Sequence, residues 1–195
     1  MDVEWIRNIL TTKVEIKDKS LEKYINLDTP IKLGGLFAND YFGKEKINLI
    51  DRLIGHLMVP GHKGGDHLRT SSTMTGKYNT AFLLLMKAFE YINSKGMNPI
   101  ETLIRAIENA APREGITFML VAGQRLLRQV DLSPLKRLDL VLRWIAQGTY
   151  MLSVQKNKKA YVALAEILIE ASKKQPGSYL IDKKMELEKQ AEASK

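Results

Sequence analysis

The stretch of sequence that decides the fold is residues 98–148, which read NPIETLIRAIENAAPREGITFMLVAGQRLLRQVDLSPLKRLDLVLRWIAQG. It opens on a helix start signal, because Asn98 is a good N-cap and Pro99 takes the first helical position, where its missing N–H is not needed. Glu101 stands three residues after the cap and completes a capping-box pattern. Apolar residues then recur at helical spacing until Pro112, so a helix is predicted up to that proline.

The second half of the stretch repeats this punctuation, with Ser133 as the predicted N-cap and Pro134 as the first helical residue. The predicted buried face consists of Leu135, Leu138, Val141, Leu142 and Ile145. Three basic residues are predicted to lie off that face: Lys136, Arg137 and Arg143. Trp144 lies next to the face, which favours core packing over stacking on a base. Gly148 is a candidate end of the helix, although residues 149–152 could extend it.

A β-hairpin is predicted between these helices, at residues 115–131. Residues 116–121 and 126–130 are rich in β-branched, aromatic and aliphatic side chains, which favour strands. The pair Ala122-Gly123 supplies the turn, and Asp131 ends the second strand.

The rest of the chain predicts a mainly α protein, a single domain of about six helices with one protruding β-hairpin. Further helices are predicted at residues 46–58, 77–93, 158–172 and 179–193. Residues 1–44 are predicted to be a partly irregular N-terminal extension, with a short strand at 13–17 and a single helical turn at 20–25. Residues 45–195 form the predicted helical domain, which contains a polar, glycine-rich loop at 60–75.

Positive charge is unevenly distributed along the chain. The sequence carries 30 Lys and Arg against 22 Asp and Glu, a net charge of +8. Residues 124–159 hold eight basic and two acidic side chains, and residues 32–77 hold seven and four, whereas the remaining segments are close to neutral. Clustering of this kind is typical of a nucleic-acid-binding face, although solvated surface charge is the alternative.

Composition excludes several classes of protein. A hydrophobic fraction of 45% supports a real core, and the absence of cysteine excludes disulfides and thiolate metal sites. The longest apolar run, residues 81–86, is far too short to span a membrane. The start of the sequence has no signal-peptide pattern, so a cytoplasmic protein with no membrane partner is expected.

The sequence offers only weak candidates for a metal or nucleotide site. His56, His62 and His67 could form a metal site with Asp66, but their spacing matches no zinc motif, and no metal or cofactor is predicted. The segment 61–65 resembles a phosphate cradle. A P-loop ending at Gly76-Lys77 would need a glycine at Ser71 and a Ser or Thr at Tyr78, so the pattern fails.

Glu108 and Glu114 are candidates for an acid–base pair. They are interpreted as surface carboxylates, because nothing else in the sequence completes an active site. The protein is therefore predicted not to be an enzyme.

Short motifs along the chain occur in a recognisable order. They are Tyr24-Ile25-Asn26-Leu27, Phe42-Gly43-Lys44, Asp51-Arg52-Leu53-Ile54, Ala88-Phe89-Glu90, Asn98-Pro99-Ile100, residues 106–114, residues 130–137, and Ser178-Tyr179 with Lys183, Lys184, Glu186 and Glu188. In order and spacing they resemble the small-subunit ribosomal protein seven family, in its archaeal and eukaryotic branch. The resemblance runs from about Val14 to the end of the sequence.

The resemblance implies a structural RNA-binding protein. Such a protein would bind the 3′ major domain of small-subunit ribosomal RNA, nucleate assembly of the head, and place its hairpin near the exit site for tRNA and messenger. The implied partners are this RNA, neighbouring head proteins, mRNA and exit-site tRNA. By position in the motifs and on the expected basic face, the rRNA-binding residues are expected to be Lys44, Lys46, Arg52, Lys77, Arg113, Arg125, Arg128, Lys136, Arg137, Arg143, Lys156, Lys158 and Lys159.

Three segments depart from the family pattern. Residues 34–41 replace a basic run before Phe42, and Lys77 is the only basic residue at the entry to its helix. Residues 118–121 are more apolar than the corresponding strand of relatives. Two rival interpretations stay open: a non-ribosomal paralogue that binds other RNA or acidic proteins, and a helical protein-interaction module. Co-sedimentation with small subunits and RNA binding at moderate salt separate them.

Overall fold

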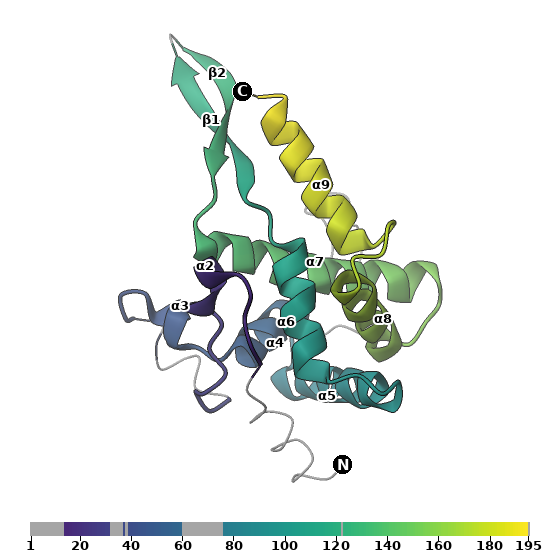
Figure 1. The fold of residues 1–195 in the computed structure, drawn as a ribbon. Helices are drawn as coiled ribbons and strands as arrows, with labels where there is room; N and C mark the ends of the chain where they lie inside the picture. The colour runs from purple at the N-terminus through teal and green to yellow at the C-terminus, as the bar shows by residue number, and fades with distance from the viewer. Residues whose placement is uncertain (1–13, 32–36, 38, 60–75, 122, 195) are drawn as a thin grey trace.

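The computed structural model describes residues 14–31, 37, 39–59, 76–121 and 123–194. In this part of the chain eight helices form one body around a shared apolar core, and a two-stranded antiparallel sheet projects from it (Figure 1). In chain order the elements are α2 (Lys19–Glu22), α3 (Gly43–Lys46), α4 (Leu49–Met58), α5 (Tyr78–Ser94), α6 (Pro99–Ala110), β1 (Glu114–Val121), β2 (Gln124–Asp131), α7 (Pro134–Gln155), α8 (Ala160–Ser172) and α9 (Tyr179–Glu192). The predicted fold class, a mainly α domain with one hairpin, is confirmed. The two helices beyond the predicted six are the four-residue α2 and α3.

Helix α8 lies at the centre of the helical body. Its sequence is apolar almost all round, which is typical of a helix that is buried on every side. It packs on α5, α6, α7 and α9, and Leu164 and Leu168 have no exposed surface. The surrounding helices each turn one apolar face to this core. Trp144 of α7 is only 8% exposed, which confirms the prediction that it packs in the core.

Helix α7 does not end at Gly148 but continues to Gln155. Its 22 residues make it about 33 Å long at ~1.5 Å per residue. Gly148 marks a close approach instead, because a Cβ there would lie 2.7 Å from the Cδ1 atom of Tyr179 and 3.1 Å from the Cδ1 atom of Ile167. The glycine therefore lets α7 pack tightly against α8 and the start of α9.

The helix predicted at residues 46–58 is α4, but it begins three residues later than predicted, because Asn48 caps it and separates it from the short helix α3. The side-chain carbonyl of Asn48 accepts a hydrogen bond from the N–H of Ile50 at 2.9 Å and so caps α4. Its side-chain amide donates to the carbonyls of Leu27 at 3.1 Å and Thr29 at 2.6 Å. Asn48 is 4% exposed, so it ties the N-terminal segment to the body from a buried position.

We expect Asn48→Ala to lower the free energy of unfolding by about 2 kcal/mol, because a helix cap is lost and two backbone carbonyls lose their donor. Asn93→Ala is the matched control, since Asn93 is exposed on α5 and its substitution should change stability by less than about 0.5 kcal/mol. Urea unfolding followed by circular dichroism measures both. Equal effects of the two substitutions would contradict the role given to Asn48.

Two smaller predictions for the N-terminal part also differ from the structure. The described residues 14–17 of the predicted strand at 13–17 do not form one. The predicted helical turn is α2, which is capped by Asp18 through a 3.0 Å hydrogen bond from the N–H of Ser20. The loop predicted at residues 60–75 lies outside the described residues. No helix in the described part of the chain combines the length and apolar character needed to cross a bilayer.

Candidate nucleic-acid interface

The hairpin rises from the body between α6 and α7, where it was predicted. Strands β1 and β2 pair along their full lengths, and Gly123 turns the chain with a φ of 81°, which favours glycine. At the base, the N–H of Leu132 donates to the carbonyl of Arg113 at 3.0 Å. Arg125 and Arg128 are both exposed on β2. The predicted hairpin cations are therefore presented to solvent away from the core.

The last helix braces one side of the hairpin. Helix α9 runs beside it (Figure 1) and contacts both strands. The N–H of Gln129 donates to the carbonyl of Ser194 at 3.3 Å. The N–H of Arg113 donates to the Glu188 carboxylate of α9 at 3.1 Å. These contacts fix the direction in which the hairpin projects.

The projecting part of the hairpin is apolar as well as basic. Phe118 is 71% exposed and Leu120 is 74% exposed, and both share a face with Arg125 because Leu120 pairs with Arg125. On the other face, the Arg128 guanidinium lies 3.8 Å from the sulfur of Met119. A two-stranded ribbon that projects from the body leaves such side chains uncovered. The sequence showed the apolar run but not that it would be exposed.

Lys136 and Arg143 form a second basic strip on the outer side of α7. They are seven residues apart, which places them on the same side of a helix, and both are exposed. Lys136 lies in the first turns of α7, close in sequence to the base of β2. The outer side of α7 and the hairpin therefore both present cations to solvent.

Arg137 points the other way, so the prediction that it lies off the buried face is wrong. It is 6% exposed, and its guanidinium donates to the Pro112 carbonyl at 2.9 Å, the Ser20 hydroxyl at 2.5 Å and the Asp18 carboxylate at 2.9 Å. Burial favours a raised pKa for Asp18, but the hydrogen bonds from Ser20 and Arg137 hold that pKa below its ordinary value. Arg137 thus joins α2, α7 and the end of α6 from inside the protein.

Asp139 of α7 is the centre of a second internal charge cluster. Arg52 of α4 donates to its carboxylate at 2.6 Å, Lys44 of α3 lies 3.1 Å away, and the His56 Nε2 atom lies 4.0 Å away. The side chain of Arg52 is only 5% exposed. The cluster joins α3, α4 and α7. Two of the predicted RNA-binding cations, Lys44 and Arg52, are therefore paired with a carboxylate of the protein.

The surroundings of Asp139 favour its ionised form. Burial alone would raise the pKa of Asp139, but His56, Arg52 and Lys44 together hold it well below its ordinary value of 3.8. Of the three, His56 is beyond normal hydrogen-bond reach at 4.0 Å, whereas the Arg52 contact is short, so we assign most of the effect to Arg52.

Three of the remaining predicted cations lie on α3 or in the connection between α7 and α8, not on the hairpin: Lys46, Lys156 and Lys158. Lys46 pairs with Asp40 at 2.7 Å, and Lys158 pairs with Glu166 at 2.7 Å. Lys156 follows Lys136 by 20 residues, which separates their backbones by about 30 Å along α7 at ~1.5 Å per residue. The predicted set is therefore spread over the molecule and does not form one compact patch.

Considered together, the predicted RNA-binding residues divide into two groups. Eight are exposed and have no carboxylate partner within the described part of the chain: Lys77, Arg113, Arg125, Arg128, Lys136, Arg143, Lys156 and Lys159. Five hold carboxylates of the protein itself: Lys44, Lys46, Arg52, Arg137 and Lys158.

The two carboxylates considered as an acid–base pair, Glu108 and Glu114, are both held by other groups of the protein. Glu108 was predicted to be a surface carboxylate, but its side chain is 8% exposed; it accepts hydrogen bonds from the N–H groups of Lys17 and Asp18 and pairs with Arg105. Glu114 accepts a hydrogen bond from the side-chain amide of Gln129 at 2.6 Å. No group of three His, Cys, Asp or Glu side chains in the described residues could hold a metal ion. The histidines and aspartate of the segment at 60–75 lie outside those residues.

Comparison with known proteins identifies relatives across nearly the whole chain. Residues 21–195 match the profile of the family described as ribosomal protein S7p/S5e. The chain is 40% identical over 186 residues to the small ribosomal subunit protein uS7 of Nanoarchaeum equitans (strain Kin4-M), and the match covers 93% of each protein.

Proposed function

Because the chain belongs to the ribosomal protein S7p/S5e family, we propose that it binds the 3′ major domain of small-subunit ribosomal RNA and nucleates assembly of the head. A structural role in the small ribosomal subunit follows from the family itself and from the uS7 relative. The finer proposal also places the hairpin near the exit site for tRNA and messenger, in a protein that resides in cytoplasmic ribosomes and carries out no catalysis.

The observation that carries the proposal is the group of unpaired cations on the hairpin and on α7. Arg125, Arg128, Lys136 and Arg143 are exposed, and no carboxylate of the described residues neutralises them. Basic side chains of this kind bind phosphates by releasing the counterions that the nucleic acid holds. Folded RNA would be recognised mainly through its shape and backbone, because the A-form major groove is too narrow for side chains.

The two internal clusters support this role from inside the protein. Arg137 and Arg52 are buried in ion pairs with Asp18 and Asp139, so they do not compete for phosphates. They hold α2, α4 and α7 together and so fix the surface on which the exposed cations lie. We therefore propose direct RNA contact for the exposed group and a structural role for these two arginines.

The hairpin also suits the other proposed partners. Its exposed Phe118 and Leu120 lie beside Arg125, a combination that can contact unstacked bases or the apolar surface of a neighbouring head protein. Messenger and exit-site tRNA are the proposed nucleic-acid partners at this position.

Replacing Arg125, Arg128, Lys136 and Arg143 together with glutamine tests the proposal. We expect the plot of log affinity against log salt concentration to become shallower by about 3, since each lost phosphate contact removes roughly 0.7 to 0.9. The ligand is a transcript of the 3′ major domain, and filter binding or fluorescence anisotropy gives the affinity. The matched control changes four exposed lysines elsewhere, Lys19, Lys87, Lys95 and Lys173, to glutamine.

If both variants lose the same slope, binding depends only on the net charge of the protein. That outcome would contradict a defined RNA face.

Sedimentation separates the rival interpretations. The wild-type protein should travel with small subunits in a sucrose gradient at moderate salt. A protein that stays at the top of the gradient, and that binds only other proteins, would be an interaction module instead.

A further inference from the structure

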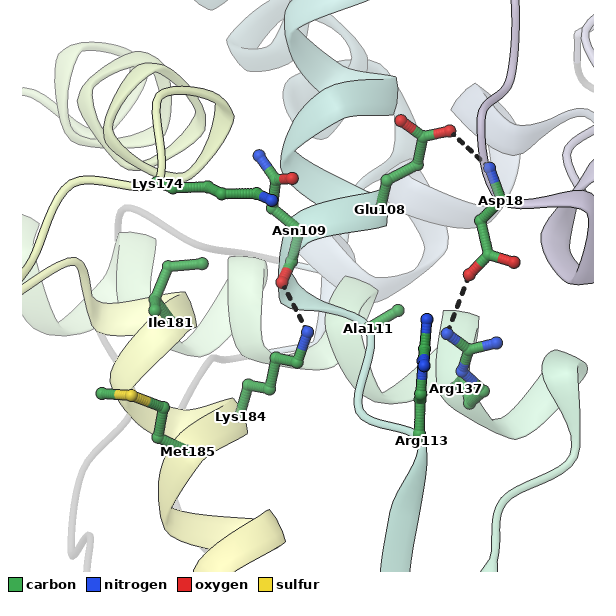
Figure 2. A pocket seen from close by; sticks show the side chains of 10 residues that line it. All are labelled: Asp18, Glu108, Asn109, Ala111, Arg113, Arg137, Lys174, Ile181, Lys184 and Met185. Atoms are coloured by element: carbon green, nitrogen blue, oxygen red, sulfur yellow. Dashed lines mark hydrogen bonds and ion pairs between the residues drawn. The ribbon is translucent and has the colours of Figure 1, made fainter.

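A basic pocket lies beside the Arg137–Asp18 ion pair, where the end of α6, the start of α7, the segment after α8 and helix α9 meet. It has a volume of about 340 Å³, and Figure 2 shows the side chains that line it. Its charged lining consists of Arg113, Arg137, Lys174, Lys184, Asp18 and Glu108. Four cations against two carboxylates leave an excess of two positive charges in a concave site. Lys174 and Lys184 were not among the predicted RNA-binding residues.

Both carboxylates of the pocket are already engaged by the protein. Asp18 accepts hydrogen bonds from Arg137 at 2.9 Å and from the Ser20 hydroxyl at 2.6 Å. Glu108 pairs with Arg105 at 2.9 Å and accepts from two backbone N–H groups. Neither carboxylate is therefore available to neutralise the remaining cations.

The three other cations keep hydrogen-bond donors unused. Within the described residues, the Arg113 guanidinium and the Lys174 ammonium form no hydrogen bond or ion pair. Lys184 donates one of its three N–H groups to the carbonyl of Asn109 at 3.0 Å. In Figure 2 the side chains of Lys174 and Lys184 extend toward Asn109, and that of Arg113 extends toward Ala111 from the opposite side.

The surroundings of Lys184 also favour a bound anion. Burial lowers the pKa of Lys184, and the charges of Arg113, Arg137 and Lys174 lower it further, although Glu188 acts in the opposite direction. Crowded cations repel one another in the empty pocket. An anion between them would remove that repulsion and use the free N–H donors.

We propose that this pocket binds a phosphate group, held by Arg113, Lys174 and Lys184. A guanidinium and two ammonium groups from three separate segments can approach a tetrahedral oxyanion from different sides, which suits phosphate better than a planar carboxylate. The same chemistry is offered by free phosphate and by a phosphate of the RNA backbone; the second source rests on the proposed function. In both cases the anion would join the ends of α6 and α8 to α9.

Thermal unfolding of the full chain tests the pocket directly. In sodium phosphate at ten times its dissociation constant, we expect Tm to rise by about 3 to 5 °C relative to sodium chloride of equal ionic strength. Lys174→Met should abolish this rise. Two controls should keep it: Lys174→Arg retains the charge, and Lys173→Met removes an equal charge from an exposed neighbour outside the pocket.

Binding to the RNA transcript distinguishes the two sources of phosphate. If an RNA phosphate occupies the pocket, Lys174→Met should make the salt dependence shallower by roughly 0.7 to 0.9, and Lys173→Met should leave it unchanged. A Tm response without this change of slope assigns the pocket to a free anion. The proposal is overturned if Lys174→Met and Lys173→Met behave alike in both measurements. If the wild-type protein still binds the RNA in that case, the proposed function stands although the pocket proposal fails. If Tm responds to phosphate as expected but the protein binds no RNA, the pocket proposal stands and the proposed function fails.

Discussion

Arg137→Met is expected to lower the free energy of unfolding by about 3 kcal/mol, whereas the adjacent Lys136→Met should change it by less than about 0.5 kcal/mol. The two substitutions remove the same charge from neighbouring positions. Arg137 is buried, and its loss leaves the Asp18 carboxylate without its counter-charge and the Pro112 carbonyl without the guanidinium donor. The expected loss is at the low end for a broken buried pair because the side chain of Asp18 is 26% exposed.

RNA binding should show the opposite order for this pair. Lys136→Met should make the salt dependence of affinity shallower by roughly 0.7 to 0.9, and Arg137→Met should leave the slope unchanged at temperatures where the variant is folded. Urea unfolding and anisotropy titrations provide the two measurements. A change of slope for Arg137→Met would show that the Arg137 guanidinium leaves Asp18 to bind RNA. That result would contradict the structural role proposed for Arg137.

Asp139→Asn is the second substitution with a large expected effect, a loss of about 3 kcal/mol at neutral pH, because it leaves the buried Arg52 guanidinium without a counter-charge. The loss should depend on pH. The folded protein holds the pKa of Asp139 below its ordinary value of 3.8, so the carboxylate stabilises the fold fully above that pH and progressively less as the pH falls below it. Wild type and variant should therefore converge in stability in acid.

Unfolding measured between pH 7 and pH 3 checks this convergence. The matched control is Asp28→Asn, because Asp28 is exposed and its carboxylate forms no ion pair within the described residues. The control should follow the wild type at every pH. A difference between wild type and Asp139→Asn that stays constant down to pH 3 would rule out the ionised carboxylate as the source of the effect.

Local signals in the sequence were enough to predict α6, the hairpin and the start of α7. Asn98 does cap α6, with hydrogen bonds from the N–H groups of Ile100 at 3.0 Å and Glu101 at 3.4 Å. Ser133 occupies the N-cap of α7, although its side chain forms no capping hydrogen bond. Such signals depend on residues within a few positions of each other, so they can be read without knowing the fold.

The features that were not predicted depend on partners far away in the sequence. Helix α4 begins after Asn48, later than predicted, where the Asn48 amide is held by the carbonyls of Leu27 and Thr29, and the apolar periodicity gives no sign of these distant contacts. Arg137 can be buried because its guanidinium donates hydrogen bonds to Asp18 and Ser20, which lie far from it in the sequence. Position on a helix could not distinguish it from the exposed Lys136 next to it.

The candidate site, like the fold, was predicted only in part. Net charge located the basic segments, and motif order located the family, but neither could divide the cations into exposed and internally paired groups. Lys174 and Lys184 were missed because they lie in a segment of the sequence with balanced charge. The packing of α8 and α9 against α6 brings Lys174, which follows α8, and Lys184 of α9 to the same pocket as Arg113.

The contact of α9 with both strands has a consequence for how the protein matures during translation. The hairpin emerges from the peptide tunnel well before the helix that supports it, since 61 residues separate the end of β2 from the end of α9. At synthesis rates of about 5 to 20 residues per second, this interval lasts roughly 3 to 12 s. During that time the nascent chain lacks the helix that orients the hairpin, so the geometry that RNA would recognise is complete only after α9 has been translated.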